Sequence, residues 1–415
     1  MPTVEAGTAS PSAEADVIIV GGGPAGIATA LFLGHADPER QQRVVVLEKE
    51  RYPRDKYCAG GIGARADRWL ADIGVTVDVP SVSIEGVSLK LPGGTVCRRE
   101  GPIGRVVRRI EYDHALARAA ASRGIRICEQ AKVTALDVGR EGVTVVSTAG
   151  VFRGRVVVGA DGVGSFVRKA MGLPRGRLRA EVIELDTEEV DGDPERDLLH
   201  FDAADRTLTG YSWDFPTLVD GQPLVCRGVY HLKIDDDPLD IRARLAARLA
   251  ERGLDIANYR LKRYAERGFE LHEPYAAPRV LLVGEAAGID ALTGEGIAQA
   301  IAYGAFAGPY LAEKLRTSDL VFGDFGARLA RSKVGIELGV RARILPHFFG
   351  RHRAHVERFL LGTPDVVTIG VQHFGGKPMS RSKFVRSALS AGWHALSAAA
   401  GDLSWPRRDA ARLIE

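Results

Sequence analysis

The sequence lacks the cysteine and histidine patterns that bind metals or form disulfide frameworks. Its four cysteines are scattered through 415 residues without a CxxC pair, which favours a reducing compartment. The ten histidines show no ligand spacing, and His352 and His355 lie among arginines that would repel a cation. We therefore expect no metal site.

An excess of charge of one sign is also missing, as are long hydrophobic runs. Lys and Arg total 56 against 53 for Asp and Glu, a balance that argues against nucleic-acid binding as the main role. No window holds about 18 uninterrupted apolar residues, so we expect no membrane-spanning helix. Residues 1–15 have neither the basic nor the apolar stretch of a signal peptide, so we expect a cytoplasmic protein.

Glycine, in contrast, is abundant, with 48 residues in the chain. Six positions near the N-terminus, 21–26, read GGGPAG between a β-branched run and a helix-like segment. In such a turn Gly21 permits the tight bend, Gly23 lets the backbone approach a pyrophosphate, and Gly26 lets the helix pack on the strand. The helix that begins around Ala25 then directs its amide groups at the phosphates. The pattern predicts a dinucleotide site.

A carboxylate at the end of the second predicted strand supports that site. Glu48 follows residues 43–47, and it lies 22 residues after Gly26. At this spacing a carboxylate can accept hydrogen bonds from both ribose hydroxyls of an adenosine. We include its neighbour Lys49 in the predicted cofactor site.

Two later segments distinguish FAD from NAD. Residues 156–168 form a strand that runs into an acidic turn, in which we expect Asp161 to shape the turn and to contact the cofactor only indirectly. Residues 283–297 form a second strand and turn, where Glu285 could reach ribityl or ribose hydroxyls. The amides around Gly294, Gly296 and Ile297 could face the flavin pyrimidine edge, which is negatively charged when the flavin is reduced.

These motifs together resemble the FAD-dependent oxidoreductases of the para-hydroxybenzoate hydroxylase type. GGGPAG, Arg109 four residues before Asp113, GADGVGS and GEAAGIDALTGEGI occur in the order and spacing of that family, across residues 15 to 315. The resemblance implies that Arg109 begins a helix facing the cofactor and pairs with the pyrophosphate. One departure is Glu285, because the family usually has Asp there.

Within that family, residues 210–216 (GYSWDFP) look like the YxWxFP motif of geranylgeranyl reductases. On a strand, the side chains of Tyr211, Trp213 and Phe215 share one face and form a flat apolar wall. The resemblance implies that this wall lines a lipid cavity beneath the flavin. Ordinary sheet packing is the alternative reading of the same three aromatics.

Residues 54–63 (RDKYCAGGIG) are similar to the basic-Cys-Gly-Gly loop of the same reductases, which passes close to the flavin ring. Gly60 and Gly61 let the backbone approach the ring face. Basic neighbours predict a lowered pKa for Cys58, which could then donate a proton or contact the flavin. The alternative is that Cys58 is a small buried apolar residue.

We predict an α/β fold built from three parts. A discontinuous Rossmann-like FAD domain with a parallel sheet takes residues 15–75, 105–175 and 276–330. A substrate domain with an antiparallel sheet takes 76–104 and 176–275, and residues 331–415 form a helical C-terminal region. The substrate should lie between the flavin and the aromatic wall.

The resulting functional hypothesis is an FAD-dependent reductase of isolated C=C bonds in an isoprenoid or lipid-like substrate. Hydride would come from FAD, and the proton from Cys58, Tyr211 or water. The alternatives are a flavin-dependent monooxygenase or halogenase on a secondary metabolite, and a flavin-bound sensor without turnover. Because no second GxGxxG occurs between residues 165 and 280, NAD(P)H or another electron donor should bind only transiently.

The tail carries basic residues and a potential apolar helical stripe at Phe384, Leu389, Trp393 and Leu396. We expect this stripe to pack on the body of the protein. The alternative is a peripheral contact with the inner membrane face.

Overall fold

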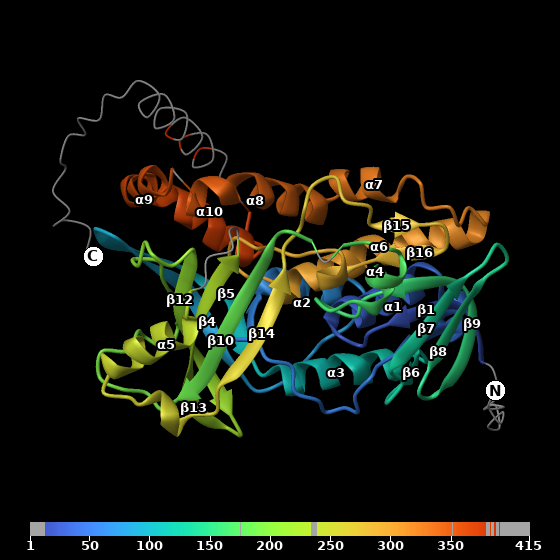
Figure 1. The fold of residues 1–415 in the computed structure, drawn as a ribbon, viewed down its shortest axis with the longest axis horizontal. Helices are drawn as coiled ribbons and strands as arrows, with labels where there is room; N and C mark the ends of the chain where they lie inside the picture. Colours follow the sequence, from blue (N-terminus) through green and yellow to red (C-terminus); the bar gives the residue numbers. More distant parts are fainter. Residues whose placement is uncertain are drawn as a thin grey trace, which may run out of the picture.

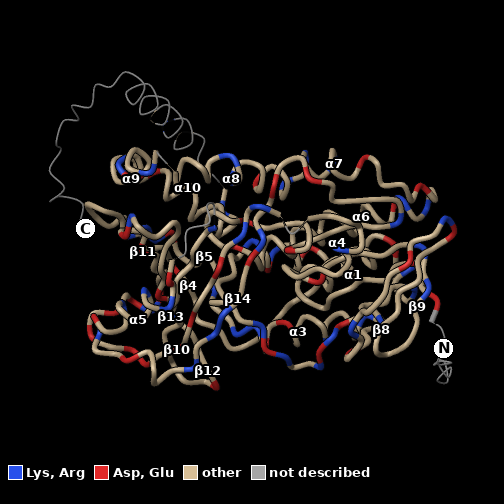
Figure 2. The backbone as a smooth tube through the Cα atoms, viewed as in Figure 1, with Lys and Arg blue, Asp and Glu red and all other residues tan. Residues whose placement is uncertain are grey.

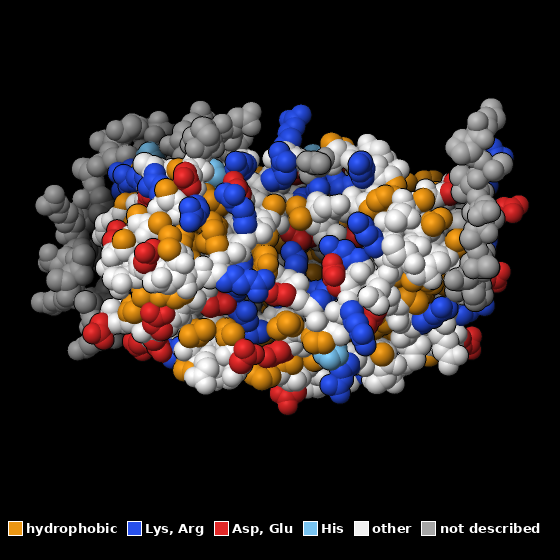
Figure 3. Space-filling model, turned by 60° about the horizontal axis from the view of Figure 1, so that its bottom comes forward, with side chains coloured by type: hydrophobic (Ala, Val, Ile, Leu, Met, Phe, Trp, Pro, Cys, Tyr) orange, Lys and Arg blue, Asp and Glu red, His pale blue; other side chains and the backbone are white. Residues whose placement is uncertain are grey.

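The computed structural model describes residues 13–174, 176–233, 239–350 and 352–378, together with residues 382, 386 and 390. Two large sheets lie toward opposite ends of an elongated molecule, and the C-terminal helices extend along one side of both (Figure 1). Lys and Arg are interspersed with Asp and Glu along the described chain (Figure 2) and over the face shown in Figure 3. The fold is therefore α/β with two sheets and a helical C-terminal region, as predicted.

The first sheet has eight strands, and its central path runs β15-β16-β9-β1-β2-β6. Strands β16, β9, β1, β2 and β6 are parallel, while β7 and β8 add an antiparallel ribbon beside β9. Their bounds are β1 Ala13–Val20, β2 Val44–Leu47, β6 Arg126–Cys128, β7 Val133–Val138, β8 Val143–Ser147, β9 Gly150–Gly159, β15 Ala276–Ala277 and β16 Val280–Leu282. The continuous apolar runs of β1 and β2 are buried because helices cover the sheet.

Two helices that begin at the predicted dinucleotide site pack closely against each other. Helix α1 (Pro24–Ala36) packs along α6 (Ile297–Thr317) at Gly304 and Gly308. A Cβ on Gly304 would lie 2.6 Å from the Ala28 carbonyl carbon, so only glycine allows this approach. The other helices of this part are α2 Ala64–Asp72, α3 Arg109–Ala121 and α4 Phe166–Ala170.

The second sheet also has eight strands, in the order β14-β10-β13-β12-β11-β4-β5-β3. All neighbours are antiparallel except β4 and β11, which are parallel. The bounds are β3 Gly61–Gly63, β4 Ser81–Leu91, β5 Gly94–Val107, β10 Arg179–Thr187, β11 Leu198–Asp202, β12 Gly210–Val219, β13 Gln222–Lys233 and β14 Lys262–Arg267. Strands β4 and β5 form an antiparallel hairpin in which Leu91 pairs with Gly94.

The two faces of this sheet have different partners. Ile183, Leu185 and Val229 pack against helix α5 (Ile241–Ala250) in one hydrophobic cluster. The alternating positions Val182 and Tyr230 belong to a second cluster, which contains the aromatic residues of β12. This second face looks toward the C-terminal helices.

The C-terminal helices are α7 Phe325–Arg331, α8 Lys333–Phe349, α9 Arg353–Gly362 and α10 Pro364–Phe374. Helix α10 packs on β5, where Gly104 lies against the Phe374 ring. The predicted tail stripe at Phe384, Leu389, Trp393 and Leu396 falls outside the described residues. Among the helices that are described, none combines the length and apolar character needed to cross a membrane.

The α1–α6 contact yields a prediction about stability. Gly304→Ala should destabilise the fold by about 1–3 kcal/mol, because the new methyl group meets backbone atoms of α1 and the helices must separate. Gly326→Ala in α7 is the matched control, since nothing lies within 4 Å of its added Cβ. The control should be neutral or stabilising by up to about 1 kcal/mol. Thermal unfolding measures both, and equal melting temperatures would contradict the packing argument.

Candidate active site

The glycine turn between β1 and α1 has the geometry of a phosphate site. Gly21 has φ +106°, and a Cβ there would lie 2.3 Å from the Ala160 carbonyl oxygen. At Gly23, by contrast, an added Cβ would meet only an Arg54 nitrogen at 3.9 Å. Helix α1 has no side-chain cap at its N-terminus, so its first amides are available to an anion.

Glu48 is fixed at the edge of this turn. Its two carboxylate oxygens accept hydrogen bonds from the amides of Gly22 and Glu50, both at 3.0 Å. The adjacent Lys49 behaves differently, because its side chain is 67% exposed and its Nζ lies 3.9 Å from a Glu50 carboxylate oxygen. The structure thus places Glu48 at the site and leaves the predicted role of Lys49 unsupported.

The buried carboxylate of Asp113 binds two arginines near the glycine turn. Asp113 accepts two hydrogen bonds from Arg109, at 2.7 and 2.8 Å, and one from Arg54 at 3.0 Å. Arg54 also pairs with Glu48 at 3.2 Å. Sequence reasoning identified Arg109 and overlooked Arg54, although its place in the basic loop was a usable signal.

The turn after β9 contains Asp161, which acts mainly as a helix cap. Its Oδ2 accepts the amide hydrogens of Phe166 and Val167, at 2.6 and 3.1 Å, and its Oδ1 accepts the hydroxyl of Ser165. These bonds occupy the carboxylate and begin α4. The arrangement agrees with the expectation that Asp161 shapes the turn.

Glu285 lies in the short 3₁₀ helix Gly284–Ala286 and faces the same turn. Its Oε2 would be 3.6 Å from a Cβ on Gly162. No described residue forms a hydrogen bond or ion pair with this carboxylate. It is therefore available to hydroxyl groups of a bound ligand.

The loop before α6 is held from two sides. The hydroxyls of Tyr211 and Tyr230 donate to the carbonyl oxygens of Thr293 and Ala291, at 2.6 and 3.0 Å. From α8, Arg341 pairs with Asp290 and, at 3.1 Å, with Glu295. The helix begins after Gly296 without a side-chain cap, and Gly294 has φ +68°. Free amides therefore remain at Gly296 and Ile297, where the sequence predicted them.

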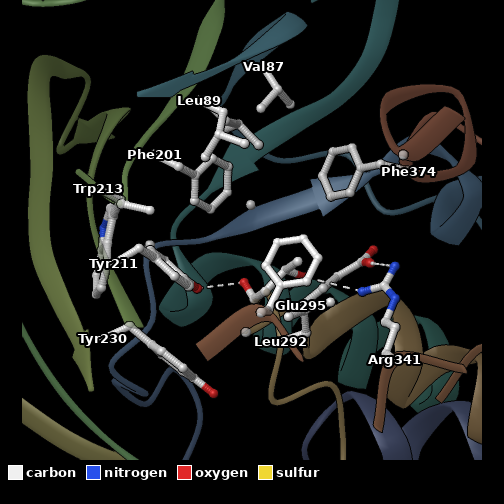
Figure 4. Close-up of a pocket in the computed structure, with 18 of the residues that line it drawn as sticks. Val87, Leu89, Phe201, Tyr211, Trp213, Tyr230, Leu292, Glu295, Arg341 and Phe374 are labelled. Atoms are coloured by element: carbon white, nitrogen blue, oxygen red, sulfur yellow. Dashed lines mark hydrogen bonds and ion pairs between the residues drawn. The ribbon is translucent and has the colours of Figure 1, made fainter. Parts of the chain in front are cut away.

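An apolar cavity of about 350 Å³ lies between this loop and the second sheet. Tyr211, Trp213 and Phe215 share the face of β12 that lines it, and Figure 4 shows Tyr211 and Trp213 beside Tyr230. Tyr211 and Tyr230 stack with ring centroids 5.0 Å apart. The neighbouring strands β11 and β4 continue this wall with Phe201, Val87 and Leu89. Helices α8 and α10 contribute Phe349 and Phe374 to the lining.

The Cys58 loop also lines this cavity, and Cys58 lies close to Arg109. Gly60 has φ +84° and packs so closely on β5 that a Cβ would be 2.0 Å from the Val107 carbonyl oxygen. Gly61 faces Phe215. The loop therefore joins the aromatic wall to the arginine cluster.

The expected lowering of the Cys58 pKa is wrong. Burial raises the pKa of this thiol, and the nearby Arg109 guanidinium only partly opposes that effect. The basic neighbours turn elsewhere, because Arg54 pairs with Glu48 and Lys56 stacks over the Tyr264 ring. Proximity in sequence therefore did not predict the electrostatic surroundings of the sulfur.

Two acidic residues in the cavity wall were missed. Glu295 pairs with Arg65 at 2.5 Å and with Arg341 at 3.1 Å, which joins α2 to α8. Glu266 lines the cavity from β14, and its Oε2 is buried. Glu295 lies between Gly294 and Gly296 in the quoted motif, which was a usable signal, whereas Glu266 has no local signature and reaches the site through strand pairing.

Comparison with known proteins identifies the family. The family described as "FAD binding domain" matches residues 14–319, so the chain belongs to it. A digeranylgeranylglycerophospholipid reductase of Methanopyrus kandleri is 34% identical over 214 residues, which cover 49% of this chain and 55% of the relative. A menaquinone reductase of Mycobacterium tuberculosis is 31% identical over 175 residues, 38% of this chain and 40% of the relative. The chain thus aligns with about half the length, or less, of these curated relatives.

Solved structures share the fold over nearly the whole chain. A geranylgeranyl bacteriochlorophyll reductase-like protein of Thermoplasma acidophilum has a TM-score of 0.66 at 17% identity, covering 95% of this chain and 100% of that structure. A flavin-dependent brominase has a TM-score of 0.69 at 18% identity, covering 94% and 100%. The resemblance drawn from the motifs is confirmed.

The residues present fit FAD. The open space above Gly23, the uncapped N-termini of α1 and α6, and the unpartnered Glu285 carboxylate supply the contacts that phosphates, a flavin edge and ribityl hydroxyls require. Glu48 would hold the adenosine ribose, and Arg109 with Arg54 the pyrophosphate. We assign these roles as predictions from the geometry.

Replacing Gly21 tests the glycine turn. Gly21→Ala should weaken FAD binding roughly tenfold or more, because both the positive φ and the contact with Ala160 oppose a side chain. Gly323→Ala, outside the cofactor motifs, is the control, since no atom lies within 4 Å of its added Cβ. Flavin content and FAD titration by fluorescence measure the effect, and unchanged affinity in Gly21→Ala would contradict the assignment.

The raised pKa of Cys58 also has a measurable consequence. Thiolate should form only at a pH above the range of an ordinary cysteine, so alkylation at neutral pH should be slow. The rate of Cys58 alkylation by iodoacetamide can be followed by peptide mass spectrometry across pH. The denatured protein is the control, and a native midpoint at or below the denatured one would refute the assignment.

Proposed function

We propose that this protein is an FAD-dependent oxidoreductase that hydrogenates isolated C=C bonds of an isoprenoid or lipid-like substrate. The observation that carries the proposal is the cavity of about 350 Å³, which is lined mainly by aromatic and aliphatic side chains and ends at the loop before α6. An isolated alkene offers no polar group for recognition, so shape and apolar contact must position it.

The aromatic wall has a defined role in this proposal. Tyr211, Trp213 and Phe215 present a flat apolar surface on which an extended chain can lie, and they keep water from the reacting carbons. Phe201 supports the wall edge-on, with its ring centroid 5.3 Å from Tyr211 and 5.1 Å from Phe215. The wall thus binds and orients the substrate.

Bound FAD, once reduced, supplies the hydride for this chemistry. The protein holds the cofactor edge with the amides of Gly296 and Ile297, and it fixes their loop through the hydroxyls of Tyr211 and Tyr230. The Tyr211 hydroxyl donates a hydrogen bond to the Thr293 carbonyl oxygen, and burial raises its pKa. Its role is therefore to position the loop. Cys58 remains a protonated thiol, and its sulfur lies beside the Gly60 amide.

A flavin-dependent halogenase or monooxygenase on a secondary metabolite is the second candidate. The likeness to a flavin-dependent brominase over 94% of this chain supports the fold that such an enzyme needs. A halogenase also needs a lysine above the substrate, and no lysine is among the described residues that line the cavity. Lys56 instead lies over the Tyr264 ring, 5.6 Å from its centroid. We therefore favour the reductase.

Anaerobic reoxidation of the flavin tests this choice. The bound FAD is reduced with dithionite, excess reductant is removed, and a geranylgeranyl lipid is added while the yellow absorbance is followed. We expect reoxidation without oxygen and a product heavier by two hydrogens for each reduced bond. A saturated phytanyl lipid is the matched control, and it should leave the flavin reduced.

Oxygen and halide form the second arm of this experiment. Reoxidation that occurs only after oxygen enters, with hydroxylated product or with halide-dependent halogenated product, would replace the reductase by the second candidate. In a separate experiment, NADH or NADPH is added to the oxidised protein, and loss of the yellow flavin absorbance identifies an electron donor.

A further inference from the structure

Glu266 is an acidic residue in the cavity wall to which the proposed function so far gives no role. It lies on β14, opposite Ala180 of β10, on the same face as Tyr264. Its Oε2 would be 3.5 Å from a Cβ on Gly294, so the carboxyl group lies directly beside the loop that precedes α6. The group therefore faces both the cavity and the expected flavin edge.

The Oε2 atom of Glu266 is buried, and it has no hydrogen-bond partner among the described residues. A buried carboxylate without such a partner is unfavourable, whereas a neutral carboxylic acid is tolerated. Burial, above all, raises the pKa of Glu266 well above its usual value. The charged groups that act on it are Glu285, Asp290 and Glu184, which raise the pKa further, and Lys56, which lowers it.

Four neutral side chains also lie near this carboxyl group. Tyr211, Tyr230 and Tyr264 keep their hydroxyl protons because burial raises the pKa of each, and the same is true of the Cys58 thiol. The Glu266 carboxyl group is thus expected to be protonated at neutral pH. It loses its proton only as the pH rises through its raised pKa.

Resting on the reductase function proposed above, we propose that Glu266 is the catalytic acid that protonates the substrate alkene. The π bond breaks as one carbon accepts a hydride, with its two electrons, from reduced flavin, and the other carbon takes the proton of the Glu266 carboxyl group. Two C–H bonds form, the flavin becomes oxidised, and Glu266 is left as a carboxylate. A proton from solvent then restores the acid.

Glu266 suits this step better than Tyr211 or Cys58. The hydroxyl of Tyr211 donates a hydrogen bond to the Thr293 carbonyl oxygen at 2.6 Å, so its proton is already engaged. The Cys58 sulfur accepts the Gly60 amide at 3.4 Å. A carboxylic acid is also intrinsically a stronger acid than a phenol or a thiol, which favours proton transfer to carbon.

The first test is kinetic. Glu266→Gln keeps the size and polarity of the side chain but removes the acidic proton. In single-turnover anaerobic reoxidation by an alkene lipid, we expect its rate to fall about 100-fold or more. The wild-type rate should decline as the pH rises, and this dependence should be absent in Glu266→Gln. Glu251→Gln, at an exposed position at the end of α5, is the matched control and should behave as wild type.

The second test does not depend on turnover. Infrared spectroscopy of the wild-type protein should show the carbonyl band of a buried, protonated carboxyl group at neutral pH, and Glu266→Gln should lack it. FAD content and reoxidation by a dye that accepts electrons without forming a C–H bond should be retained in the variant. An unchanged infrared band in Glu266→Gln, or an unchanged alkene rate, would overturn the proposal.

Two safeguards keep the result interpretable. If Glu266→Gln does not fold, Glu266→Asp takes its place, because it keeps the acid but withdraws it by one methylene. A slower alkene rate with the pH dependence retained would support the proposal, and a wild-type rate would overturn it. Wild-type protein that no alkene lipid reoxidises would instead disprove the reductase function, whatever the infrared band shows.

Discussion

Two tyrosine hydroxyls from the second sheet determine how the parts of this protein meet. Tyr211 and Tyr230 donate to carbonyl oxygens of the loop before α6, which belongs to the dinucleotide-binding part. Because a buried carbonyl without a partner is costly, these bonds fix the loop relative to the sheet. The same side chains form the wall of the cavity, so one interaction sets both the cofactor edge and the place of the substrate.

Charged residues complete this arrangement from the other side. Arg341 of α8 pairs with Asp290 and Glu295, and Arg65 of α2 pairs with Glu295 and Glu337. These buried pairs lock the C-terminal helices over the cavity, because removing one partner would leave an uncompensated charge. The apolar space is therefore closed by ionic contacts around it and not only by apolar packing.

Much of the dinucleotide site follows from local patterns. A glycine at positive φ, a helix that begins without a side-chain cap and a carboxylate at the end of a strand each leave a signature within a few residues, and Gly21, Glu48 and Gly296 all lie as the sequence predicted. The aromatic alternation of β12 is local for the same reason. The pKa of Cys58 was misjudged because residues that are neighbours in sequence need not share an electrostatic environment.

The sequence by itself determined the family, the cofactor and the aromatic wall, since these depend on turn geometry and strand periodicity within short segments. Only the tertiary structure decided which ionisable groups face the cavity. Glu266 reaches it through the pairing of β14 with β10, and Arg54 reaches the glycine turn through Asp113 of a distant helix. Burial and charge depend on contacts between segments far apart in the chain, so the protonation states that govern the chemistry become visible only after folding.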